Sequence, residues 1–198
     1  MDTSIDTIVA LEWEAFQDVH NAGGRASCQD DYRTFSIMRK SQFLAWDAQT
    51  REAYLRDLVA AKEQGRNLLT EKYARMMAYT SPLEYRQLEH ALPPVSGEAA
   101  ALADRIAATL VLWQEEYART YPRLTARARP VDDNGRGMTS FETYLRGELL
   151  TYSPETLRRL AAHVSRLRDE GMNMSVELMK HTVRMYGYAS LEEAEAAA

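Results

Sequence analysis

Apolar side chains recur along almost the whole chain with the 3.6-residue spacing of an α-helix, and this periodicity limits the folds open to it. Strand signals are nearly absent, because no Asn-Gly turn lies between alternating Val, Ile or Thr residues. The pattern predicts an all-α, single-domain bundle of about seven to eight helices over residues 1–198. The clearest stripe lies on a long predicted helix, 98–121, and consists of Leu102, Ile106, Leu110, Trp113, Tyr117 and Tyr121.

Glycine, proline and capping residues mark where the helices end. Gly65 and Gly171 are expected to close two of them, and Gly23 and Gly24 the first, because glycine accepts the left-handed conformation of a helix C-terminus. A short helix is predicted after Ser81-Pro82. Residues 93–97 and 123–137 are predicted to be internal loops and 190–198 a tail. The other predicted helices cover residues 3–19, 31–46, 49–64, 67–79, 140–151, 153–171 and 175–186.

Composition excludes several classes of protein. The formal net charge of -5 argues against a nucleic-acid-binding surface, which is normally basic. No apolar run approaches the roughly 20 residues of a membrane span, so no membrane partner is expected. The acidic N-terminus does not resemble a secretory signal, and the single cysteine suits a reducing cytoplasm.

Four charged residues lie inside apolar helical stripes, where hydrocarbon is normally found. Glu12 lies between Ile8 and Phe16, and Arg39, Lys72 and Glu148 occupy comparable positions on three other predicted helices. Burying an ionised group without a partner costs several kcal/mol, so such groups pair or bind a ligand. Their charges cancel, and we expect them to meet inside the bundle.

One interpretation is a pocket for a small polar or anionic molecule. Glu12 and Glu148 are then candidates for acid/base catalysis, because a glutamate among aromatic side chains can have a raised pKa. Lys72 is the candidate base or Schiff-base residue. Arg39 can clamp an anionic group with its forked guanidinium. The candidate ligand-binding amides beside these charges are Gln42 and Gln114. The alternative is that the four charges form structural salt bridges.

The segment between the first two predicted helices carries varied polar chemistry. His20, Arg25 and Gln29 are candidate ligand-binding residues at the mouth of the pocket. Cys28, activated by His20, is a possible nucleophile, although a lone cysteine is more often an inert small residue.

A metal-dependent enzyme is a further alternative. Glu177 and His181 have the i,i+4 spacing that could hold one metal ion together with Glu12 or Glu148. A di-metal bundle of the ferritin kind would need Glu-x-x-His, which does not occur. We assign no metal ligand, and the sequence identifies no cofactor.

Two stretches, LEWEAFQDVHNAGGRASCQDDYRTFSIMRKSQFLAW and LLTEKYARMMAYTSPLEY, carry a resemblance to a known family. The chain resembles a bacterial family catalogued as domain of unknown function 4125. The resemblance implies a single helical domain from bacteria and makes the first helix–loop–helix a plausible site. It implies no activity and no catalytic residue.

Two hypotheses of different class follow. The first is a small-molecule-binding enzyme that performs acid/base chemistry at the inward charges. The second is a non-catalytic interaction protein, a homodimer or the partner of another bacterial enzyme, in which those charges are structural.

Overall fold

The computed structural model describes residues 3–20, 24–126, 128–132 and 137–198, and these form helices and connecting segments only. Its eleven α-helices are α1 (Thr3–Gln17), α2 (Tyr32–Leu44), α3 (Ala48–Glu63), α4 (Leu68–Thr80), α5 (Pro82–Leu88), α6 (Gly97–Thr120), α7 (Pro122–Thr125), α8 (Phe141–Leu149), α9 (Pro154–Asp169), α10 (Met174–Met185) and α11 (Leu191–Ala197). Two single-turn 3₁₀ helices, η1 (Ser27–Asp30) and η2 (Glu89–Ala91), complete the described elements.

The all-α prediction is confirmed, but the predicted count of seven to eight helices is too low. The nine segments predicted to be helical already exceed that count, and the two further helices are short. α7 occupies the start of the segment predicted as an internal loop, and α11 occupies the predicted tail. Four to seven residues are too few to show an apolar period, so these helices left no clear signal in the sequence.

The longer helices begin and end within two residues of the predicted bounds. Asp47, Asn67, Ser96 and Ser153 each accept a hydrogen bond from a backbone N–H in the first turn of the helix that follows. Gly65 and Gly171 follow α3 and α9 with φ of 67° and 68°. Gly23, predicted to help end the first helix, lies outside the described residues.

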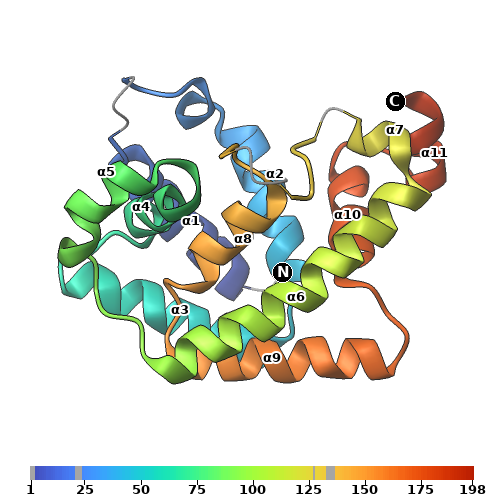
Figure 1. Cartoon of the computed structure of the whole chain (residues 1–198). Coiled ribbons are helices and arrows are strands. Elements are labelled where there is room, and N and C mark those ends of the chain that lie inside the picture. The colour runs from blue at the N-terminus through green and yellow to red at the C-terminus, as the bar shows by residue number, and fades with distance from the viewer. Residues whose placement is uncertain (1–2, 21–23, 127, 133–136) are drawn as a thin grey trace.

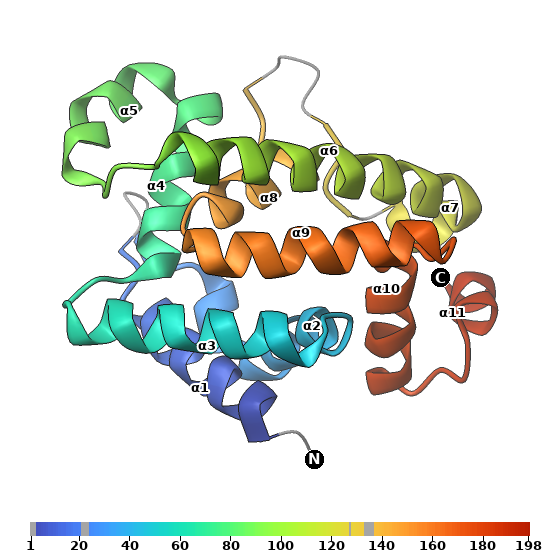
Figure 2. The same cartoon turned by 90° about the horizontal axis from the view of Figure 1, so that it is seen from below.

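The helices pack around α8, which lies in the middle of the molecule (Figure 1). α4 and α6 flank α8, while α1 and α2 pack together and α1 also contacts α3 and α4. α9 lies between α3 and α6, as the view from below shows (Figure 2). α10 packs on α2 and α6, and α11 packs on α7 and α10 at one end. This arrangement brings α1, α2, α4 and α8 side by side around one interior region.

Helices α4 and α8 pack tightly against each other. A Cβ added at Gly147 would lie 2.6 Å from the Met76 Cγ and 2.9 Å from the Lys72 backbone oxygen. Both distances are below normal van der Waals contact, so only glycine allows α8 to approach α4 this closely. Gly147 directly precedes Glu148, and the close approach therefore sets the distance between Glu148 and Lys72.

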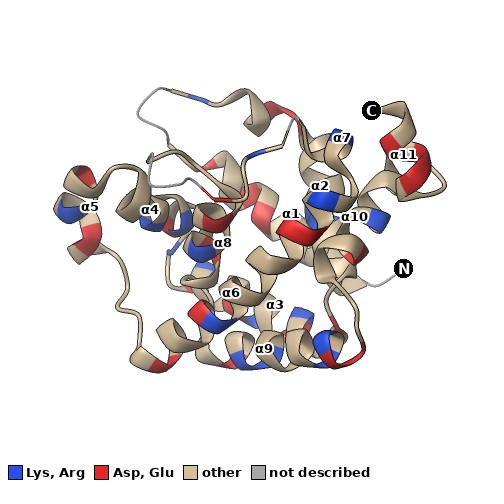
Figure 3. Cartoon of the chain, turned by 45° about the vertical axis from the view of Figure 1, so that its right-hand side comes forward, with Lys and Arg blue, Asp and Glu red and all other residues tan. Residues whose placement is uncertain are grey.

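Outside the core, the charged residues of both signs are interspersed rather than gathered into a single-sign face. Arg158 pairs with Glu98, Arg159 with Glu155 and Arg166 with Asp47 along α9. Figure 3 shows basic and acidic positions mixed along this helix. In the described part of the chain, no helix is long and apolar enough to cross a membrane.

Candidate functional site

Four helices each contribute one charged side chain to a common interior point. These are Glu12 from α1, Arg39 from α2, Lys72 from α4 and Glu148 from α8, which we call the charge cluster. The Glu12 residue is 0% exposed, and Arg39, Lys72 and Glu148 retain only small exposed fractions. The convergence expected from the apolar stripes is therefore present, and the formal charges sum to zero.

Arg39 joins the two carboxylates of the charge cluster. Its Nε donates to Glu12 Oε2 at 2.6 Å, and its Nη2 donates to Glu12 Oε1 and, at 3.0 Å, to Glu148 Oε1. Burial alone would lower the pKa of Arg39, but Glu12 and Glu148 raise it well above its ordinary value. Arg39 is thus a fixed cation held between two anions.

Glu148 is the most heavily hydrogen-bonded carboxylate of the charge cluster. Besides Arg39, it accepts from the Lys72 Nζ, from the Gln42 Nε2 at 3.0 Å and from the Tyr152 hydroxyl at 2.7 Å. Burial would raise the pKa of Glu148, but the attraction of Arg39 and Lys72 outweighs it and holds this pKa well below its ordinary value. This direction is opposite to the raised pKa that its aromatic surroundings suggested, because two cations lie within contact.

Two tyrosines, Tyr54 of α3 and Tyr152, donate hydrogen bonds to the carboxylates of the charge cluster. The Tyr54 hydroxyl donates to Glu12 Oε1 at 2.7 Å, and its ring lies 4.9 Å from that of Tyr152. Burial and the adjacent carboxylates raise the pKa of both phenols well above 10.0. Both hydroxyls therefore remain proton donors to the glutamates.

A second pair of tyrosines lies on the Lys72 side of the charge cluster. The Lys72 Nζ is 3.7 Å from the ring centroid of Tyr144, and the Arg129 Cζ is 4.8 Å from the same centroid. The Tyr144 hydroxyl is 2.9 Å from that of Tyr73. Burial alone would raise the pKa of Tyr144. The nearby Lys72 and the hydrogen bond with Tyr73 lower this pKa by more than burial raises it, so the net shift is downward.

Sequence reasoning did not select these tyrosines. Tyr144 and Tyr152 lie four residues before and after Glu148, a spacing that places residues on one helix face and could have identified them. Tyr54 and Arg129 lie on separate segments of the chain. Their contacts depend on how the helices pack, and no local pattern indicates them.

The remaining predicted ligand residues do not join the charge cluster, apart from Gln42. The Gln29 side chain is buried, but it donates to the backbone oxygens of Phe16 and Val19 and holds the end of α1. Arg25 bonds to Asp30 and Gln17 on the surface, and His20 is exposed beside the Asp18 oxygen. Gln114 lies on α6, outside the four helices that supply the charges.

In the part of the chain that the structure describes, no third metal ligand accompanies Glu177 and His181. Glu177 pairs with Lys180 at 2.8 Å, and burial together with Arg184 lowers the pKa of His181. Within the described ranges, no three His, Cys, Asp or Glu side chains are grouped so that they could hold a metal ion. Cys28 is exposed in η1, and no hydrogen bond with His20 is present.

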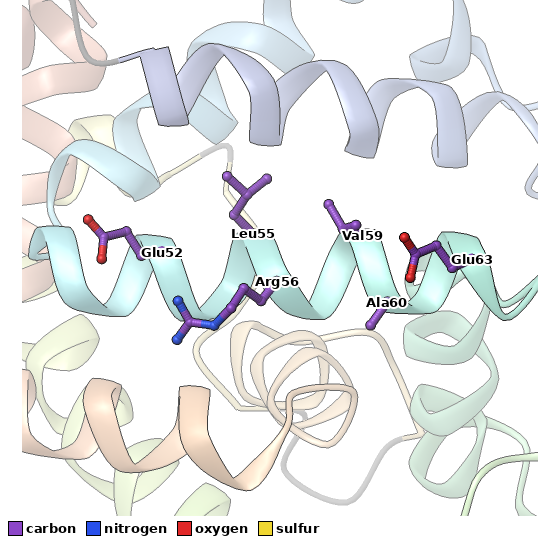
Figure 4. A pocket seen from close by; sticks show the side chains of 6 residues that line it. All are labelled: Glu52, Leu55, Arg56, Val59, Ala60 and Glu63. Carbon is purple, nitrogen blue, oxygen red and sulfur yellow. The ribbon is translucent and has the colours of Figure 1, made fainter.

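Two hollows lie elsewhere on the surface. A shallow groove of about 430 Å³ runs along α3 and is lined by Glu52, Leu55, Arg56, Val59, Ala60 and Glu63 (Figure 4). A smaller hollow of about 90 Å³ lies between α10 and α11. Neither is lined by a residue of the charge cluster, whose polar atoms face one another.

Comparison with known proteins gives a family and no activity. A family model described as "Protein of unknown function (DUF4125)" matches residues 2–196. No curated protein and no solved structure matches the chain. Because the family model covers almost every residue, the chain belongs to the DUF4125 family.

Proposed function

We propose that the protein is an enzyme that binds a small polar or anionic molecule beside the charge cluster and performs acid/base chemistry on it. The observation that carries this proposal is the convergence of two carboxylates and two cations from four separate helices on one interior point. We also propose that it acts in the bacterial cytoplasm, where its single exposed thiol would stay reduced.

The charge cluster divides into a scaffold and a reactive side. Glu12, Arg39 and Glu148 are held in place, because each has at least two polar partners at hydrogen-bond distance. Glu148 holds Lys72 against the face of Tyr144. A phenol beside a fixed cation gives up its proton more readily, which suits a general acid or base. We therefore assign proton transfer to Tyr144 and attraction of the anionic group to Lys72 and Arg129.

A panel of simple probes tests binding at this place. We would measure the melting temperature with acetate, succinate, glycine and inorganic phosphate at constant ionic strength. The matched variants are Lys72→Met and Lys62→Met, since Lys62 is an exposed lysine that pairs with Glu14 on the surface. A probe-dependent rise that is lost in K72M and kept in K62M supports the proposal. An equal rise in both variants, or no rise in the wild type, contradicts it.

The second candidate is a homodimer that packs through α3, with the charge cluster serving only stability. The groove on α3 favours it, because Val59 is 40% exposed and projects with Leu55 from the side of α3 that faces α1 (Figure 4). Arg56 and Glu63 on the same stripe could pair with Glu63 and Arg56 of an antiparallel copy. Sedimentation velocity tests this: a dimer that Val59→Glu makes monomeric supports it, and a wild-type monomer contradicts it.

A further inference from the structure

Arg75 is a buried cation with very little compensation. It lies on α4, is 6% exposed, and its Nη2 donates to the Pro93 backbone oxygen at 2.7 Å. Its Nε is buried, and among the described residues it has no hydrogen-bond partner. An arginine cannot relieve such burial by losing its proton, because its pKa stays far above neutral. A counter-ion is the remaining way to compensate the charge.

The nearest carboxylate on the same helix face is already occupied. Glu71 lies one turn before Arg75, but its two oxygens accept from the Nε and Nη2 of Arg66, each at 2.8 Å. Both oxygens of Glu71 therefore bond to Arg66, and the hydrogen bond found for Arg75 among the described residues goes to a backbone oxygen. Arg39, by contrast, donates hydrogen bonds to two carboxylates, Glu12 and Glu148.

The pKa directions agree with this contact pattern. Burial lowers the pKa of Arg75 below 12.5, and the attraction of Glu71 does not restore it. The pKa of Arg66 is raised by its hydrogen bonds to Glu71, in spite of its partial burial. Arg75 thus has the electrostatic character of a cation that lacks its own anion.

The segment that follows α4 buries little apolar surface. α5 and η2 contain no buried residue, and Leu83 at the start of α5 is 72% exposed. Figure 2 shows α5 at the edge of the molecule, next to α4. A segment with so little buried apolar surface opens locally at low cost, which gives a small ion a route to the guanidinium.

We propose that Arg75 is the cationic base of an oxyanion-binding site between α4, α5 and residues 89–97, separate from the charge cluster. Its ligand is the carboxylate or phosphate group of a small molecule. Tyr85 on α5 interacts electrostatically with Arg75, and its phenol hydroxyl is a suitable second donor to such a group. The guanidinium fork supplies two parallel donors once the anion approaches.

Calorimetric titration with inorganic phosphate and, separately, with acetate tests the proposal and distinguishes the two ligand chemistries. The variant is Arg75→Met, and the matched control is Arg86→Met, which removes the same charge from an exposed position on α5. We expect one of the two anions to bind the wild type and R86M alike, with affinity about tenfold or more weaker in R75M. We also expect R75M to melt at an equal or higher temperature without anion, since it removes a buried cation whose Nε lacks a hydrogen-bond partner among the described residues.

The variant Lys72→Met distinguishes this site from the charge cluster. Anion binding that is kept in K72M and lost in R75M takes place at Arg75. Binding of neither anion to the wild type, or equal binding to R75M, overturns the proposal. If R75M does not fold, the ¹⁵Nε resonance of Arg75 in the wild type gives the answer. A saturable shift on adding phosphate or acetate supports the site, and no shift overturns it.

Discussion

Lys72 of α4 donates a hydrogen bond from its Nζ to Oε2 of Glu148 on α8, 76 residues further along the chain. Gly147, immediately before Glu148, is the residue that lets the two helices approach. The same Nζ lies over the ring of Tyr144. The electrostatic partner of Lys72 and the candidate proton donor are therefore held on one helix, one turn apart.

Removing Glu148 alone should destabilise the protein strongly. Glu148→Gln leaves Lys72 without its carboxylate and Arg39 with one instead of two. Breaking one partner of a buried pair costs about 3–5 kcal/mol. Urea denaturation gives the free energy of unfolding. The loss of unfolding free energy in the double variant K72M/E148Q should be smaller than the sum of the two single losses, by about 0.5–3 kcal/mol. Strict additivity would show that the two residues do not interact.

Glu148 should also make stability depend on pH in the acidic range. Its pKa in the folded protein lies well below 4.5, so the unfolded chain takes up its proton first as the pH falls. The stabilisation is complete above pH 4.5 and is lost progressively below it. The difference in unfolding free energy between wild type and E148Q should therefore shrink on acidification. A difference that stays constant down to the acid transition would show that the carboxylate is not held ionised by its neighbours.

Gly147→Ala should separate α4 from α8. Its added methyl group meets the Lys72 backbone oxygen, which cannot rotate away, so the helices must shift. Overpacking of this kind typically costs about 1–3 kcal/mol. Gly97→Ala is the matched control, because a Cβ there meets nothing within 4 Å, and it should leave stability equal or raised. Equal thermal denaturation curves for G147A and G97A would contradict the close approach.

The long helices and the charge cluster could be predicted from the sequence for the same reason. A residue's place on a helix face follows from spacing alone, so Glu12, Arg39, Lys72 and Glu148 could be recognised as inward-facing without a structure. Because a buried charge requires an opposite charge nearby, the sequence also predicts that the four side chains meet. The short helices α7 and α11 lack this regularity and were missed.

The parts that depend on packing between distant segments could not be predicted. Gln29 was expected to bind a ligand because it lies in a polar loop, yet its amide holds the end of α1. Arg129 contacts Tyr144 from the segment between α7 and α8, and nothing in its local sequence indicates this. The aromatic neighbours of Glu148 in the sequence predict a raised pKa, whereas the two cations that lower this pKa lie on other helices.

The most direct measurement is a spectrophotometric titration of the tyrosines, in which the ultraviolet absorbance of tyrosinate is followed against pH. One tyrosine should ionise below its ordinary value of 10.0 in the wild type, and this step should be missing in Tyr144→Phe. Lys72→Met should move the step to higher pH, because it removes the cation over the ring, whereas Lys62→Met should leave it in place. A wild-type titration without an early step, or an early step that K72M does not move, would contradict the assignment of proton transfer to Tyr144 at the charge cluster.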